Sequence, residues 1–296
     1  MNLKVNELRR KGILRFINAG NSLGGQWYKH LGPKIVTQFY KELQFDAIAL
    51  GLSDLGIDND LEQFNSNILN VTEFIGEMIY NTRLLACNLE ADQRYISNFY
   101  SGVRKSSPLH RSQALKVATI GFMKPPKNGY ITIDGHNYVN ITDPFDCLTQ
   151  QSLNLKKNGF NVIIAVGSGD QKFFRDIAEK VELIDLVIGS YGHNKDLSLL
   201  SQRTSDNYPD YVVNGKNGQR IVVTADVFGR SYGQITLSID SNGNIKSSEG
   251  SLVPLDATNS LGNFFTIFRL FSVKSLNIFV IKSVGTESFS DECVYK

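Results

Sequence analysis

The chain has 296 residues, of which 42% are hydrophobic, and its 31 basic residues nearly balance 29 acidic ones. This is enough material for one large globular domain with its own core, or for two small ones. A net charge of +2 without a block of Lys or Arg gives no indication of nucleic acid or an anionic membrane as a partner. An aromatic content of 10%, with apolar segments along the whole length, argues against disorder.

No segment has the pattern of a secretory signal or of a membrane span. Residues 1–10 are polar and charged, whereas a signal needs an apolar core. Residues 261–284 are the most hydrophobic stretch, but Arg269, Lys274 and Lys282 interrupt them. The apolar runs between these charges are too short to cross a bilayer, so we expect a soluble chain without a membrane span.

Cysteine usage predicts no disulfide framework. Cys87, Cys147 and Cys293 are an odd number. Cys87 lies in the apolar run 84–87, so we expect it to pack in the core.

Two sequons, Asn70-Val71-Thr72 and Asn140-Ile141-Thr142, fit a secreted glycoprotein. Two such triplets also arise easily by chance in a chain of this length.

Short apolar runs alternate with helical patterns, which favours an α/β fold. In the first half the predicted elements are a strand at residues 13–17, a Gly-rich turn at 20–25, a helix at 35–43, and strands at 47–50, 84–89 and 117–122. The helix is predicted because its apolar residues recur at helical spacing on one face.

The second half continues the alternation. Its predicted elements are a helix at residues 147–157, a strand at 162–166, a helix at 171–181, and strands at 185–189, 221–225 and 234–240. Asn158-Gly159 is a helix stop signal, and the entirely apolar strand 162–166 is typical of a sheet covered on both faces. The alternation in 234–240 ends at Ser241-Asn242-Gly243, which indicates a hairpin.

Glycines stand at four predicted strand-to-loop junctions, namely Gly20, Gly51, Gly167 and Gly189. Open sheets carry their sites at the carboxyl ends of their strands. We therefore expect the functional residues directly after these glycines.

The segments at and between these junctions form a recognisable series. In chain order they are Asn18-Ala19-Gly20-Asn21-Ser22 with Gly25, Phe45 to Gly51, Cys87-Asn88-Leu89, Asn161 to Gly169, Ile184 to Asn194, and Tyr211 to Gly215 followed by residues 221–240. They resemble, in the same order, the motifs of the 5′-nucleotidase and apyrase branch of the calcineurin-like metallophosphoesterases. The resemblance is collinear and covers residues 5 to 256.

The resemblance implies an α/β fold, a four-layer α/β/β/α sandwich with two divalent metal ions at the strand ends. Such ions bind the phosphate and generate a hydroxide nucleophile. The resemblance also implies a secreted protein that hydrolyses extracellular ATP, ADP or AMP.

Two parts of the family's architecture have no counterpart in the chain. The family's first strand, with its Asp-x-His motif, would precede residue 5, and the C-terminal nucleotide-binding domain would follow Lys296. We expect residues 1–258 to form a metallophosphoesterase-like domain truncated at its N-terminus, and 259–296 to form a divergent tail or the start of a connector. Without the first strand, the sheet is expected to expose an unpaired edge at a central position. The sequence leaves open whether the chain is a fragment, the product of a decayed gene, or a shortened version kept for another use. Residues 262–280 have no interpretation.

The first two metal-binding loops of the resemblance are substituted. The metal-bridging Asp corresponds to Asn21, a neutral and weaker ligand. The Asn and the catalytic His of G-N-H-E correspond to Leu52 and Ser53, and Asp54 stands at the Glu position.

The last two loops are substituted as well. The His of G-H-S-G corresponds to Ser168, and the first His of the final motif corresponds to Tyr191, while its second His remains as His193. Only Asn21 and His193 are left as metal ligands, and two ligands cannot hold a pair of divalent ions. We therefore expect that neither the metal ions nor catalysis is retained.

Other residues offer alternatives of lower weight. Asp134-Gly135-His136 spells Asp-x-His, but in a polar insertion rather than on the opening strand. His30 and His110 lie in polar contexts, and Asp170 is more simply the N-cap of helix 171–181 than a replacement ligand. The turn at 20–25 could hold a phosphate through backbone amides, although its spacing is not that of a P-loop.

Three functions remain open on sequence alone. The first is an inactive relative that binds a nucleotide or an extracellular protein partner. The alternative is a weak metal-dependent nucleotide phosphohydrolase with altered ligands. A purely structural or antigenic secreted protein is the third.

Overall fold

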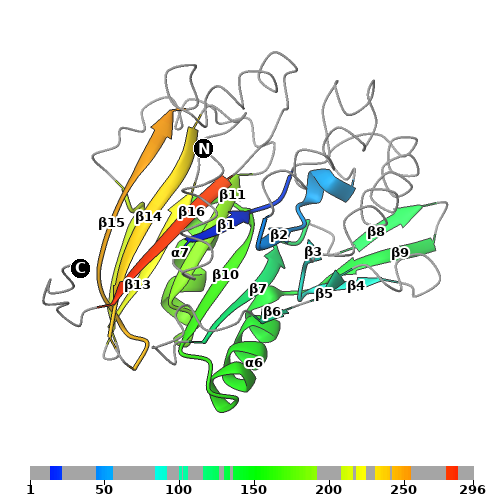
Figure 1. The fold of residues 1–296 in the computed structure, drawn as a ribbon. Helices are drawn as coiled ribbons and strands as arrows, with labels where there is room; N and C mark the ends of the chain where they lie inside the picture. The colour runs from blue at the N-terminus through cyan, green and yellow to red at the C-terminus, as the bar shows by residue number, and fades with distance from the viewer. Residues whose placement is uncertain are drawn as a thin grey trace, which may run out of the picture.

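A computed structural model of the chain describes residues 14–21, 45–55, 84–91, 100–101, 103–105, 116–126, 130–133, 136–191, 208–215, 218–224, 231–240, 242–254 and 278–285. The described strands form two large sheets and one small one (Figure 1). The fold is α/β, as predicted.

The first sheet has seven strands in the order β15-β14-β16-β1-β2-β3-β5. Their bounds are β1 (Leu14–Asn18), β2 (Ala47–Ala49), β3 (Leu84–Leu85), β5 (Tyr100–Ser101), β14 (Ser231–Ile239), β15 (Ile245–Pro254) and β16 (Ile278–Gly285). The strands β1, β2, β3 and β5 run parallel, and β14 and β15 form an antiparallel hairpin. A hairpin and a parallel set thus share one sheet.

Strand β16 joins these two parts. It pairs antiparallel with β1 over five residue pairs, from Leu14↔Lys282 to Asn18↔Ile278, and parallel with β14 over seven. In Figure 1 it is the red arrow between β14 and the blue β1. The expectation of an unpaired edge at a central position was wrong, because β16, which comes late in the chain, pairs with β1.

The second sheet has six strands in the order β12-β13-β11-β10-β7-β6. Their bounds are β6 (Val103–Lys105), β7 (Val117–Met123), β10 (Val162–Gly169), β11 (Leu186–Tyr191), β12 (Tyr211–Gly215) and β13 (Gly218–Thr224). The central strands β7, β10, β11 and β13 are parallel. Every residue of β7 is buried, as expected of a strand covered on both faces.

Two cores explain this burial. The first lies between the two sheets and includes Ile17 and Leu85 from one sheet and Val166 and Ile188 from the other. The second lies on the outer face of the six-stranded sheet, where helices α6 (Pro144–Lys157) and α7 (Gln171–Lys180) pack. The helical layer predicted around residues 35–43 lies outside the described residues.

The helix boundaries follow from their caps. Helix α6 begins three residues earlier than predicted, because the Asp143 side chain accepts a hydrogen bond from Phe145 N (2.9 Å) and Pro144 opens the helix. Its C-cap is Asn158, as predicted. Helix α7 is capped by Asp170, so the N-cap interpretation of this residue is confirmed.

The strand predicted at 84–89 is two strands. Strand β3 ends at Leu85, and β4 (Leu89–Ala91) belongs to a three-stranded sheet with β8 (Tyr130–Ile133) and β9 (His136–Ile141). Between them the buried Asn88 side chain accepts from Met123 N (2.9 Å) and donates to Met123 O (2.8 Å) and Thr142 O (2.7 Å). These bonds hold the turn between β3 and β4 against the end of β7 and the residue that follows β9.

The same turn carries a disulfide between Cys87 and Cys147, whose Cα atoms are 6.0 Å apart. The cysteine count offered no argument for this pairing, whereas the expected core packing of Cys87 is confirmed by its contact with the core beneath α6 and α7. The apolar run placed Cys87 in a strand, but the residue lies in the turn after β3 and faces the first turn of α6.

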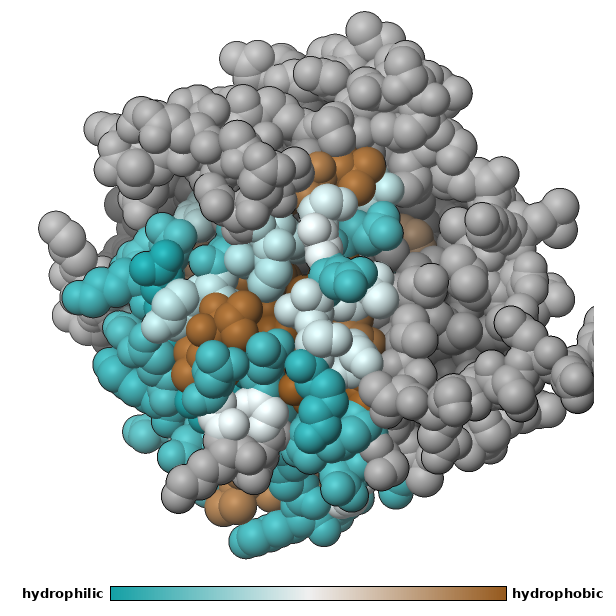
Figure 2. Space-filling view, turned by 90° about the vertical axis from the view of Figure 1, so that its left-hand side faces the viewer, coloured by the Kyte–Doolittle hydropathy of each residue, from teal (hydrophilic) through white to brown (hydrophobic). Residues whose placement is uncertain are grey.

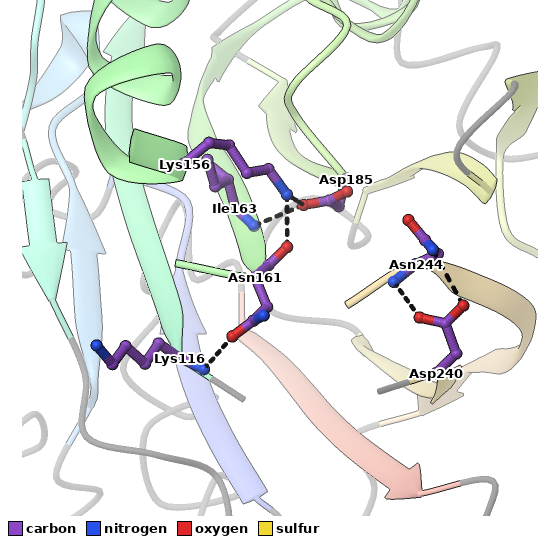
Figure 3. Close-up of polar contacts among 7 residues, drawn as sticks. All are labelled: Lys116, Lys156, Asn161, Ile163, Asp185, Asp240 and Asn244. Carbon is purple, nitrogen blue, oxygen red and sulfur yellow. Dashed lines mark hydrogen bonds and ion pairs between the residues drawn. The ribbon is translucent and has the colours of Figure 1, made fainter. Parts of the chain in front are cut away.

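The amino ends of the second sheet hold a polar cluster far from the strand-end glycines. Asp185 accepts from Ile163 N (2.7 Å) and Lys156 Nζ (3.1 Å), and the Lys156 ammonium also donates to Asn161 O (2.5 Å; Figure 3). Nearby, Asp240 accepts from the amide groups of Asn244 and closes the β14–β15 hairpin. These contacts are structural ties between strands.

The described surface is mainly polar. Figure 2 shows a mostly hydrophilic face with a limited apolar area in its middle. Among the described residues the only exposed large hydrophobic side chain is that of Leu153, at 40%. No helix within these residues is long and apolar enough to span a membrane.

Candidate functional site

The candidate site lies where strands β1, β2, β10 and β11 end. Five polar side chains are buried there, with at most 3% of their surface exposed, namely Asn18, Asn21, Asp54, Ser168 and Ser190. We call these five residues the junction cluster. Three of them, Asn21, Ser168 and Ser190, directly follow the junction glycines Gly20, Gly167 and Gly189.

The turn after β1 places Asn21 in the cluster. Gly20 and Asn21 both have positive φ, 93° and 60°, and Gly20 N donates to Asn18 Oδ1 (2.7 Å). A Cβ on Gly51 would lie 2.1 Å from Asn21 Oδ1. Gly51 is therefore required so that the loops after β1 and β2 can approach each other.

Asp54 joins these two loops. It lies in the 3-10 helix η1 (Leu52–Leu55), and its Oδ2 accepts hydrogen bonds from Asn21 N and Gly51 N, both at 2.8 Å. The side chain is 2% exposed. Its carboxylate is thus a buried acceptor for backbone amides, a common way to hold a loop.

Asn21 links the two sheets. Its Nδ2 donates to Ser190 Oγ (3.1 Å), at the end of β11. Because β1 and β11 belong to different sheets, this bond ties the sandwich together at the site.

Ser168 lies directly beside Ser190, as their two strands pair in register. Ser168 is 3% exposed, and its Oγ has no hydrogen-bond partner among the described residues. A buried hydroxyl of this kind is available to a water molecule or a ligand.

Two of the remaining substituted positions, Leu52 and Tyr191, lie among the described side chains. Leu52 is half-buried and apolar. Tyr191 is half-buried, and its ring packs edge-on against Phe174 at 5.9 Å between centroids. Ser53 lies in η1, but its side chain, like His193, falls outside the described residues.

Asp170 follows β10 but serves the helix rather than the cluster. Its carboxylate accepts from Phe173 N (2.9 Å) and pairs with Lys124. Burial alone would raise the pKa of Asp170, but the Lys124 ammonium and the Phe173 amide together hold this pKa below its ordinary value.

Sequence reasoning missed Ser190 and the role of Asp54. Ser190 directly follows Gly189, where functional residues were expected, but it does not stand at any of the positions where the resemblance implies a metal ligand. Asp54 was recognised only as a substituted position. The signal for this role is the position of Asp54 three residues after Gly51. An acidic side chain at that position can accept hydrogen bonds from the backbone amides of the preceding turn.

The junction cluster does not fit the two divalent ions that the resemblance implies. Its donors are two hydroxyls, two neutral amides and one carboxylate whose Oδ2 already accepts two N–H groups. Metal pairs need several free carboxylates or imidazoles. In the part of the chain that the structure describes, no three His, Cys, Asp or Glu side chains gather. His30, His110, Asp134 and His193 lie outside this part, as does the side chain of His136.

Comparison with curated proteins supports the resemblance. The chain is 24% identical to an apyrase of Anopheles gambiae over 259 residues, 27% identical to a snake venom 5′-nucleotidase of Crotalus adamanteus over 261, and 26% identical to human 5′-nucleotidase over 262. These matches cover 83 to 86% of the chain but 42 to 43% of the relatives. The chain thus spans less than half their length. No family model matches it.

Solved structures give the same fold. A 5′-nucleotidase precursor from Thermus thermophilus superposes with a TM-score of 0.62 at 16% identity, covering 87% of this chain and 48% of that one. A calcineurin-like phosphoesterase from Bacillus subtilis gives 0.54 at 17% identity, covering 87% and 83%. The α/β metallophosphoesterase fold is therefore shared.

Proposed function

The chain is a relative of the 5′-nucleotidases and apyrases, and we propose that it no longer hydrolyses nucleotides and acts by binding. The ligand we propose first is a nucleotide, bound through its phosphate without a metal ion. An extracellular protein is the second candidate partner.

The hydrogen-bonded junction cluster is the observation that carries the loss of hydrolysis. In it, Asp54 and Asn21 hold the loops after β1 and β2 and the end of β11 together by direct bonds of 2.8 to 3.1 Å. Hydrogen bonds within the chain thus make the ties that metal ions make in a two-metal site. Substitution at several separate junctions also favours adaptation to a metal-free state over a single chance event.

The buried hydroxyl of Ser168 supports retention of a ligand. A buried hydroxyl without a partner costs about 1–3 kcal/mol, and a phosphate oxygen or water would satisfy it. The ends of parallel strands are the usual ligand position in α/β sheets.

We also propose an extracellular location and glycosylation. The Cys87–Cys147 disulfide supports this location, because disulfides persist in oxidising compartments. The sequons support glycosylation.

The first experiment is phosphate release from ATP, ADP and AMP by the purified chain, with Ca, Mg, Mn or Zn present in turn. A catalytically active apyrase serves as the positive control. We expect release no faster than without protein, from a chain shown to be folded by circular dichroism. Metal-dependent release that His193→Ala abolishes would instead establish the alternative, a weak phosphohydrolase with altered ligands.

The second experiment measures binding of the same nucleotides by calorimetry in the presence of EDTA. Ser168→Ala is expected to weaken binding about tenfold or more, the usual loss for a hydrogen bond to a charged group. Ser152→Ala is the matched control, since Ser152 is an equally buried serine whose hydroxyl donates to Thr149 O (3.1 Å) within α6. Equal effects of both substitutions would exclude the junction cluster as the binding site.

A further inference from the structure

Strand β9 carries one of the two sequons at the surface. Asn140 is exposed, whereas the next residue, Ile141, is 1% exposed and lies in the core. Asn140 pairs with Glu90 of β4 and with Tyr130 of β8. The alternation along the strand therefore directs the Asn140 amide away from the protein.

We propose that Asn140 is an N-glycosylation site, which rests on the extracellular location proposed above. The donor is an oligosaccharide carried on a polyprenyl diphosphate. A bond forms between Asn140 Nδ2 and C1 of the first sugar as the bond between C1 and the diphosphate oxygen breaks. The polyprenyl diphosphate leaves with the electron pair, and Nδ2 loses one proton.

The folded structure accommodates this product. Asn140 Nδ2 donates to Glu90 Oε2 at 2.8 Å on the exposed side of the sheet. A side-chain amide has two hydrogens on nitrogen, so the linkage to sugar leaves one of them. The bond to Glu90 can therefore persist after glycosylation and fix the orientation of the first sugar.

The disulfide supplies an independent observation at the same place. Thr142, the third residue of the sequon, donates from its backbone N to Asn88 O (2.9 Å), and Asn88 Nδ2 donates to Thr142 O (2.7 Å). Asn88 directly follows Cys87 of the Cys87–Cys147 disulfide. The sequon and a bond that requires an oxidising compartment thus share one local structure.

This structure also predicts the order of events. In the fold, Asn140 and Thr142 are held by backbone pairing and by the bonds to Asn88. An enzyme needs the sequon extended and free, so we expect transfer of the sugar before β9 has folded against β4.

The test directs the whole chain into the secretory route of a eukaryotic cell with an added signal sequence. This addition makes the outcome independent of the chain's natural location and of its activity toward nucleotides. Release with peptide N-glycosidase in heavy-oxygen water converts a glycosylated Asn to a labelled Asp, which mass spectrometry of the peptide with Asn140 detects. The peptide with Asn70 is measured separately.

We expect labelled residue 140 in the unchanged chain and in Asn214→Gln, an exposed strand asparagine outside any sequon. Thr142→Ser keeps the sequon and the label, whereas Asn140→Gln and Thr142→Ala each lose one glycan on a gel. An unlabelled Asn140 in secreted chain with the Cys87–Cys147 bond formed would overturn the proposal. The label at residue 140 is measured on the unchanged chain, so this result does not depend on whether a variant folds.

Discussion

At the scale of single residues, Asp54 shows how a substituted site keeps its structure. Its carboxylate holds two backbone amides, Asn21 N and Gly51 N, in a buried environment. Its removal leaves two buried donors without an acceptor, and each such donor costs about 1–3 kcal/mol.

We therefore expect Asp54→Ala to lower the free energy of unfolding by about 3 kcal/mol, measured by urea denaturation. Asp54→Asn keeps an acceptor oxygen of the same size and should cost clearly less. Equal losses in the two variants would mean that the carboxylate's hydrogen bonds are not what stabilises these loops.

Asp185 gives a prediction for pH. Burial raises the pKa of Asp185 above its ordinary value of 3.8, and the nearby Lys156 ammonium only partly offsets this. The folded state therefore binds this proton more tightly than the unfolded state. The contribution of Asp185 to the free energy of unfolding therefore falls as the pH rises from about 4 through the folded-state pKa.

Asp185→Asn removes the titrating group, so the wild-type chain should lose stability relative to this variant as the pH rises from about 4 to 7. The measurement is urea denaturation at several pH values. Asp176→Asn, which removes a carboxylate of α7 that pairs with Lys180 at 3.8 Å, is the control for loss of one negative charge. A gain of wild-type stability with pH would show that Lys156 outweighs burial.

At the scale of elements, the disulfide fastens helix α6 to the turn after β3. It joins residues 60 positions apart. Closing a loop of this length in the unfolded chain is worth about 4 kcal/mol in the chain-entropy model.

Replacing both Cys87 and Cys147 by Ala should lower the free energy of unfolding by about 4 kcal/mol, and reduction of the wild-type chain should act alike. Cys293→Ala is the control for loss of a cysteine. A double variant as stable as the wild type in oxidising buffer would contradict the disulfide.

Strand β16 is the second element with a testable role. It lies between β14 and β1, so both of its edges are paired. Proline lacks the backbone N–H and is found almost solely in edge strands.

Ile281 pairs with Arg15 and with Ile235. Ile281→Pro should therefore destabilise the chain by about 3 kcal/mol or more, measured by thermal and urea unfolding. Ile281→Val keeps the backbone N–H and should cost clearly less. A stable proline variant would show that β16 is not part of the sheet.

At the scale of the whole molecule, the two sheets are joined at both ends by contacts within the chain. The junction cluster ties them at the carboxyl ends of the strands, and the Asp240 hairpin packs against Asn161 at the other. We therefore expect the fold to be stable without a metal ion.

Addition of Ca, Mg, Mn or Zn should then leave the melting temperature unchanged relative to EDTA. A site occupied at 100 times its Kd would add about 2.7 kcal/mol to the folded state, which is a shift of several degrees. A melting temperature that rises with one metal, and no longer rises in His193→Ala, would identify that ion as a ligand and contradict this prediction.

Much of the fold was determined by the sequence itself. The entirely apolar run at 162–166 and the amphipathic run at 171–181 follow from local periodicity, and Asp170 and Asn158 follow from local capping chemistry. The collinear motifs also place Asn21, Leu52, Ser168 and Tyr191, without coordinates, at the positions where the resemblance implies metal ligands.

Only the tertiary structure decided which distant groups meet. The pairing of Cys87 with Cys147, the insertion of β16 beside β1 and the bond from Asn21 to Ser190 all join residues far apart in the chain. Such contacts depend on how the sheets pack, and the local pattern around each residue carries no record of its partner. The sequence thus determined the secondary-structure elements, whereas packing decided which side chains meet at the strand ends.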